Sequence, residues 1–118
     1  MTAAGEARLL FVYGSLKRGF SNHRLLAGAR FVGECRTEAR YQLLVLGIYP
    51  ALSDQGDRAI AGELYALDAR QLSKLDEFEG EAYRRRAVQL EDGRVAEAYF
   101  LVPERRAQAA PDPRDRWL

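Results

Sequence analysis

The chain has 118 residues, 47% of them hydrophobic, and this length suits one domain (residues 1–118) with a real core. Lysine and arginine total 18 against 17 acidic residues, so a net charge of +1 gives no overall field for nucleic acid or an anionic membrane. The single cysteine, Cys35, excludes an intramolecular disulfide and suits a reducing compartment. With one cysteine and one histidine, His23, we find no metal-ligand spacing.

The N-terminal segment, residues 1–8, is small and polar, and we expect it to be loose. The apolar run at residues 9–16 is too short to span a bilayer, and Lys17 and Arg18 follow it, which is the wrong order for a signal peptide. We therefore predict a cytoplasmic protein with no membrane or nucleic-acid partner.

The run at residues 9–16 predicts a buried strand that stops abruptly at Gly14 and Ser15. Glycine lets backbone N–H groups approach a ligand without a side chain in the way, and a bare loop after a strand is a common place for a small anion. A plain turn closed by Gly14 accounts for the same residues, so this segment alone leaves both interpretations open.

The middle of the chain predicts a short helix near residues 20–26, followed by strands at 31–35, 41–46 and 60–67. Ser21 or Asn22 is the expected helix cap. His23 is either a proton carrier or a surface residue. Between the strands, residues 47–50 (GIYP) predict a rigid loop carrying Tyr49, which either walls a pocket or forms a plain turn. Residues 53–57 predict a polar turn.

A helix is predicted from Ala69 to about Phe78. Asp68 and the amide side chain three residues later have the spacing of a capping box. Glu79 lies seven residues after Leu72, so it shares the apolar face of this helix. Gly80 can end the helix with a positive φ.

Two environments for Glu79 follow from this placement. An apolar face, the negative end of the helix dipole and neighbouring acidic residues disfavour a charged carboxylate and raise its pKa, as general acid–base catalysis near neutral pH requires. In the alternative, Glu79 turns around the helix end and pairs with Arg84, Arg85 or Arg86, which lowers its pKa.

The last part of the chain predicts a hairpin and a tail. Asp92-Gly93 is a two-residue hairpin signal, which sets Arg86 opposite Tyr99, where a cation–π contact is a sufficient role for the arginine. The same register sets Leu90 opposite Val95. Residues 103–118 predict an irregular tail, and Trp117 docks either on the body or on a second subunit.

Several motifs in this order resemble the γ-glutamylcyclotransferase-like (AIG2-like) family, and in particular its γ-glutamylamine cyclotransferases. They are Tyr13-Gly14-Ser15-Leu16 with Lys17, Gly19 and Asn22, then Gly47-Ile48-Tyr49-Pro50, Gly62-Glu63-Leu64-Tyr65, and Leu75-Asp76-x-x-Glu79-Gly80 with Tyr83. The resemblance runs from about Leu9 to Val102. It implies an α+β fold with a small mixed, strongly curved or barrel-like sheet and a few flanking helices.

The resemblance also implies a site and a reaction. Residues Tyr13, Gly14, Ser15 and Leu16 would form a substrate loop, supported by Asn22, Tyr49 and Tyr83, with Glu79 as the general acid and base. A γ-glutamyl amine, amino acid or peptide would cyclise to 5-oxoproline and release the free amine. The substrate's own amine is the nucleophile, so the reaction needs no metal or cofactor, and the protein is expected to be a monomer or homodimer.

Two further functions remain compatible with the sequence, because proteins that share a fold can have different functional sites. A non-catalytic protein could bind a small amino-acid derivative in the same pocket without using Glu79. A structural or adaptor domain would fill the pocket with side chains.

Overall fold

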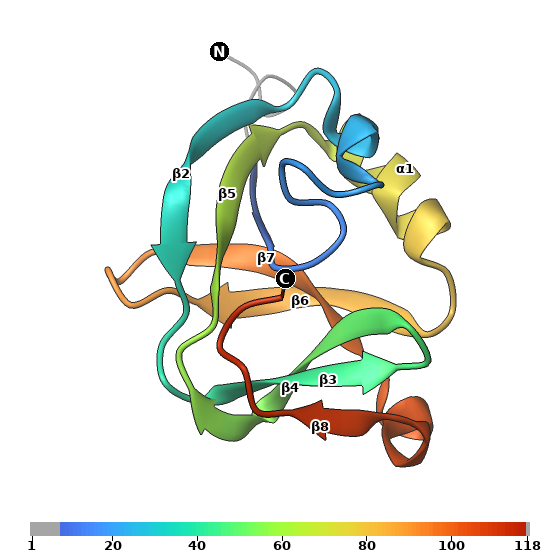
Figure 1. Ribbon diagram of the computed structural model, residues 1–118. Coiled ribbons are helices and arrows are strands. Elements are labelled where there is room, and N and C mark those ends of the chain that lie inside the picture. The colour runs from blue at the N-terminus through green and yellow to red at the C-terminus, as the bar shows by residue number, and fades with distance from the viewer. Residues whose placement is uncertain (1–7, 118) are drawn as a thin grey trace.

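The computed structural model describes residues 8–117, and its strands form two sheets that pack against each other (Figure 1). In chain order the elements are β1 (Arg8–Val12), η2 (His23–Leu26), β2 (Arg30–Arg36), β3 (Tyr41–Leu46), β4 (Tyr49–Arg58), β5 (Ala61–Leu67), α1 (Ala69–Glu79), β6 (Tyr83–Gln89), β7 (Val95–Leu101), η3 (Pro103–Gln108) and β8 (Ala110–Asp112). Of the predicted loose N-terminus, only Arg8 lies within the described residues, and it begins β1. None of the helices in residues 8–117 has the length and apolar character needed to cross a membrane.

The larger sheet has five strands in the order β2-β5-β1-β7-β6, and the smaller has three in the order β4-β3-β8. Neighbouring strands are antiparallel except β1 and β7, which pair in parallel at Leu10 and Glu97. The predicted α+β fold with a small, mixed and curved sheet is confirmed. The strands form two open sheets and do not close into a barrel.

Strand β1 is buried on both faces from Leu10 to Val12, which explains the apolar run that follows Arg8. Phe11 belongs to the core cluster between the two sheets, together with Leu43 of β3. Leu10 and Val12 point to the opposite face and pack with the helix residues Leu72 and Leu75. The end of β1 therefore lies where the two sheets and α1 meet.

Helix α1 begins and ends as the sequence predicts. The Asp68 carboxylate accepts a hydrogen bond from the Gln71 backbone at 2.8 Å, and the Gln71 side chain accepts one from the Asp68 backbone at 2.9 Å. Gly80 follows with φ 74°, a conformation that favours glycine. The capping box fixes the start of the helix at Ala69, and Gly80 fixes its last residue as Glu79.

The predictions for two loop segments are wrong. The GIYP segment turns only at Gly47 and Ile48, with Gly47 at φ 66°, and Tyr49 already begins β4. The predicted polar turn at 53–57 falls within β4, an edge strand, where Ser53 is buried and the exposed residues 54–57 bulge out between the positions paired with Gln42 and Tyr41. An edge strand tolerates Pro50 and exposed polar residues, because one side of its backbone needs no partner.

The predicted helix near residues 20–26 is a single 3-10 turn, η2. Its cap residue is Asn22, but the Asn22 side chain makes no hydrogen bond to the helix backbone. The prediction of a side-chain cap is therefore wrong, and this amide serves the neighbouring loop instead.

The hairpin of β6 and β7 differs from the predicted register by one residue. Gln89 pairs with Val95, and Arg86 pairs with Ala98. The Leu90 N–H donates to the Arg94 carbonyl at 2.9 Å, so the loop has three residues, with Gly93 at φ 93°. Arg86 still makes a cation–π contact, but its partner is Phe100, 4.8 Å from guanidinium carbon to ring centre.

The predicted irregular tail is wrong for residues 103–112, which form η3 and β8, and β8 pairs with β3. Beyond β8, the Trp117 carbonyl accepts a hydrogen bond from Lys17 Nζ at 2.7 Å, and Arg114 lies over the Trp117 ring. Trp117 thus docks on the body of its own chain.

Candidate active site

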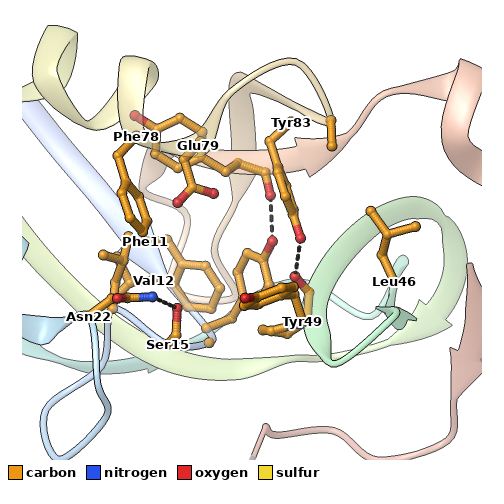
Figure 2. Close-up of a pocket in the computed structure, with 15 residues that line it drawn as sticks. Phe11, Val12, Ser15, Asn22, Leu46, Tyr49, Phe78, Glu79 and Tyr83 are labelled. Carbon is orange, nitrogen blue, oxygen red and sulfur yellow. Dashed lines mark hydrogen bonds between the residues drawn. The ribbon is translucent and has the colours of Figure 1, made fainter.

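A cavity of about 480 Å³ lies where β1 ends, enclosed by the loop after β1, the start of β4 and the end of α1 (Figure 2). All eight residues predicted for the site line this one cavity: Tyr13, Gly14, Ser15, Leu16, Asn22, Tyr49, Glu79 and Tyr83. The structure thus brings together segments from three separate parts of the chain. Their roles in binding and catalysis stay predictions.

The loop after β1 turns its carbonyl groups away and leaves N–H groups available. Each carbonyl of residues 14–17 accepts a hydrogen bond of 3.0–3.1 Å, from the Lys17, Asn22 and Phe20 backbones and from Nδ1 of His23. Within residues 8–117, the N–H groups of Gly14, Ser15 and Leu16 have no acceptor. Three consecutive free donors at a cavity can bind a carboxylate or an oxyanion.

The Ser15 side chain is oriented by Asn22. The Asn22 amide donates to Ser15 Oγ at 2.9 Å, as Figure 2 shows, and the Ser15 carbonyl accepts the Asn22 N–H. Because Oγ accepts this bond, its own proton remains available to a ligand. His23 contributes through its bond to the Leu16 carbonyl, which is a contact to the loop rather than to the cavity.

Gly14 is needed because Pro50 packs directly against it. A Cβ atom at Gly14 would lie 2.4 Å from Pro50 Cγ, while the φ of Gly14 is not in the left-handed region. The Tyr83 hydroxyl donates to the Pro50 carbonyl at 2.8 Å and so fixes Pro50 from the other side. The loop after β1, which leaves the five-stranded sheet, is therefore positioned by β4 of the three-stranded sheet.

Glu79 points into the cavity from the end of α1 (Figure 2). Burial raises the pKa of Glu79 to about 7, and the negative charge of Asp76 adds to this effect. The alternative pairing with arginine is contradicted, because within the described residues no cation forms a salt bridge with Glu79. Arg85 binds Asp76 and Glu97, and Arg86 binds Asp54.

Two tyrosines of the cavity, Tyr13 and Tyr83, stay neutral across the physiological range. Tyr13 donates its hydroxyl proton to the Tyr99 carbonyl at 2.7 Å, and burial raises its pKa well above the usual value. Burial, together with the charge of Glu79, raises the pKa of Tyr83 to about 12. Glu79 is therefore the lining residue with a pKa suited to exchange a proton near neutral pH.

Sequence reasoning missed the apolar walls of the cavity, which are Phe11, Val12, Leu46, Pro50, Phe78, Ala82 and Tyr99. Val12 and Phe78 each precede a predicted site residue, so proximity in sequence was a usable signal. Tyr99 comes from β7, and only the correct hairpin register and sheet order bring it to the cavity.

Comparison with known proteins gives a consistent result. Residues 10–118 match the sequence model of the family described as gamma-glutamyl cyclotransferase, AIG2-like. A putative gamma-glutamylcyclotransferase of Methanocaldococcus jannaschii is 36% identical over 101 residues, covering 80% of this chain and 84% of that protein. The human gamma-glutamylaminecyclotransferase is 42% identical over 81 residues, covering 60% of this chain and 52% of that protein. The match thus spans about half the length of the human relative.

Solved structures share the fold. An AIG2-like protein from Mus musculus superposes with a TM-score of 0.74 at 28% identity, over 84% of this chain and 82% of that one. Allophanate hydrolase from Kluyveromyces lactis gives a TM-score of 0.81 at 20% identity, over 90% of this chain and 19% of that one. The second likeness shows the fold alone.

The contact between Gly14 and Pro50 predicts a steric effect of a single methyl group. Gly14→Ala should lower the free energy of unfolding by about 1–3 kcal/mol, because the methyl group overlaps the Pro50 ring. Gly33→Ala is the matched control, since a Cβ atom there meets nothing within 4 Å. Urea unfolding of both variants measures the difference, and equal stabilities would show that the loop can move away from Pro50 at no cost.

The raised pKa of Glu79 predicts a stability effect that depends on pH. The folded state holds the Glu79 proton up to about pH 7, whereas the unfolded state releases it near 4.5. The Glu79 contribution therefore favours folding below pH 4.5 and is lost as the pH rises to about 7. Glu79→Gln, which stays neutral, should gain stability relative to the parent between pH 5 and 7 and hold that gain at pH 8. Denaturant unfolding at these pH values tests this, and a loss at pH 8 would indicate an ion pair.

Proposed function

Because this chain belongs to the gamma-glutamyl cyclotransferase, AIG2-like family, we propose that it converts a γ-glutamyl compound to 5-oxoproline and a free amine. One observation carries the proposal: a carboxylate with a pKa of about 7 lines the same cavity as residues 14–16, whose backbone N–H groups have no acceptor within the described chain. These are the proton carrier and the anion-binding donors that an intramolecular cyclisation requires.

In the proposed reaction the ionised Glu79 carboxylate takes a proton from the substrate's α-ammonium group. The amine then attacks the γ-carbonyl carbon, closing a five-membered ring and placing negative charge on the carbonyl oxygen. Glu79 donates its proton to the nitrogen of the leaving group, and the C–N bond to that nitrogen breaks. The ring nitrogen then loses its extra proton, and the expelled amine takes up this proton. 5-Oxoproline therefore has a neutral nitrogen, and the free amine leaves as an ammonium ion.

In this proposal the loop and the cavity walls provide most of the rate enhancement, by holding the substrate and by stabilising the oxyanion. Holding the two reacting groups of one substrate in the cyclising conformer can remove about 7–11 kcal/mol of barrier in favourable cases. A backbone donor aimed at the developing oxyanion contributes about 3 kcal/mol. A Glu79 pKa near 7 makes both the basic and the acidic form abundant at neutral pH, as a group that first accepts and then donates a proton requires.

The charge pattern of the cavity supports an amine without a carboxylate as the leaving group. Glu79 is the one charged residue among those that line the cavity within the described chain. The rim is apolar, with Tyr49 56% and Phe78 46% exposed. A carboxylate next to the leaving nitrogen, as in a γ-glutamyl amino acid, would meet no cation there. The human and bovine relatives named gamma-glutamylaminecyclotransferases are consistent with this choice.

Replacing Glu79 tests the reaction. Glu79→Gln keeps the shape of the side chain and removes the base, so turnover should fall by about 10²–10⁴-fold. Ser15→Ala, which leaves the backbone donors in place, should lose only the ~1 kcal/mol of one neutral hydrogen bond. Glu77→Gln, exposed on the same helix, is the matched control. Release of 5-oxoproline is the measurement, and near-normal release by Glu79→Gln would remove this residue from the mechanism. If Ser15→Ala were equally damaging, the hydroxyl would take part directly.

A substrate pair tests the leaving group. A γ-glutamyl alkylamine should have a kcat/KM at least about tenfold above that of γ-glutamylalanine, because the alanine carboxylate must be desolvated without a partner. Both compounds share the γ-glutamyl half, so the ratio isolates the leaving group. Equal values would contradict the assignment to amines, and no product from either compound would favour a non-catalytic binding protein.

A further inference from the structure

Glu63 is a buried carboxylate outside the cavity. Its side chain is 11% exposed, and in the sheet it lies opposite Val12, the last residue of β1. Glu34 of β2 lies opposite it on the other side. Directly opposed residues of antiparallel strands point to the same face, so the Glu63 side chain stands where the chain leaves the sheet to form the loop.

Both carboxylate oxygens of Glu63 are used. Oε1 accepts the backbone N–H of Arg18 at 3.0 Å and the Tyr65 hydroxyl at 3.0 Å, and Oε2 accepts Arg18 Nε at 3.3 Å. The Arg18 guanidinium therefore compensates the buried charge. It also reaches Glu34 at 3.4 Å, but the Glu34 side chain is 77% exposed.

These contacts differ in kind from the other hydrogen bonds of the loop. The bonds to the carbonyls of residues 14–17 come from within residues 17–23, so they fix the shape of the loop but not its position on the sheet. The bond from the Arg18 N–H to Glu63 ties the far end of the loop to β5. A charged acceptor makes it stronger than a neutral backbone bond. A second tie, from Lys17 Nζ to the Trp117 carbonyl, comes from the C-terminal segment.

We propose that Glu63 is a positioning residue, which holds the backbone donors of residues 14–16 at the cavity by binding the N–H of Arg18. Its kinetic consequence rests on the function proposed above, whereas its effect on the loop does not. Two substitutions of Glu63 separate the effect of its side-chain length from the effect of its charge. Glu63→Asp keeps the charge but withdraws the carboxylate by one methylene, and Glu63→Gln keeps an acceptor oxygen at full reach without the charge.

Amide hydrogen exchange tests the tie to the sheet without any substrate. In Glu63→Asp the Arg18 amide should exchange about tenfold faster or more, while the amides of α1 keep their protection. Glu63→Gln, which keeps an acceptor oxygen at full reach but loses the charge, should raise the exchange rate less than Glu63→Asp does. Glu34→Gln removes the exposed partner of the same arginine and should change nothing. An unchanged Arg18 amide in Glu63→Asp, or an equal effect of Glu34→Gln, would overturn the proposal.

Kinetics then test the consequence for the site. Glu63→Asp should raise KM for a γ-glutamyl alkylamine by about tenfold, the effect of one weakened charge-assisted hydrogen bond. Glu63→Gln should raise KM less than Glu63→Asp does, and the pH midpoint of kcat should stay at that of the parent in both variants, because Glu79 is untouched. A faster Arg18 amide with an unchanged KM would overturn the positioning role. If the parent itself released no 5-oxoproline, the proposed function would fail, and the exchange experiment would still decide the structural tie.

Discussion

The ion pair between Asp76 and Arg85 keeps a negative charge beside Glu79, which adds to the effect of burial in raising the pKa of Glu79. Arg85 lies on β6, the strand that follows α1, and its side chain is partly buried. Its guanidinium forms salt bridges with both Asp76 and Glu97. The hydrogen bonds from Arg85 lower the pKa of Asp76, so Asp76 is ionised throughout the range in which Glu79 titrates. Within the described residues, Glu79 therefore has a negative neighbour and no salt-bridge partner. The Asp76 side chain is 41% exposed, so the pair contributes little to the stability of the fold.

The cavity depends equally on the packing of the two sheets. The donor loop leaves the five-stranded sheet, whereas Pro50 belongs to the three-stranded sheet and contacts Gly14 without room for a methyl group between them. Tyr83, at the start of β6, holds the Pro50 carbonyl. Glu79 comes from α1, which packs on the opposite face of the larger sheet. The parts of the site therefore come together only when both faces of that sheet are covered, which explains why residues 9–12 of β1 are all apolar.

Signals that are local in sequence predicted the local structure well. The capping box at Asp68, the glycine after Glu79 and the apolar strand at 41–46 each depend on a few adjacent residues. Structural features that depend on residues far apart in the sequence could not be predicted from such local signals. The second half of β4 has polar residues because it lies at a sheet edge, and the β6–β7 register shifts by one because the Leu90 N–H pairs with the Arg94 carbonyl. Likewise, three adjacent arginines made an ion pair with Glu79 plausible, but in the fold Arg85 and Arg86 pair with Asp76 and Asp54 instead.

The fold alone does not select an activity, since an allophanate hydrolase shares it at 20% identity. The composition of the cavity is more selective. Within the described chain, it is lined by one carboxylate with a pKa of about 7, by residues 14–16, whose backbone N–H groups have no acceptor, and by Tyr13 and Tyr83, whose pKa values are raised. Cys35 lies outside it, and burial raises the pKa of that thiol to about 11, which keeps it from acting as a nucleophile. Such a cavity can move protons and stabilise negative charge, but it offers no strong nucleophile of its own. Its groups therefore match a reaction in which the substrate attacks itself.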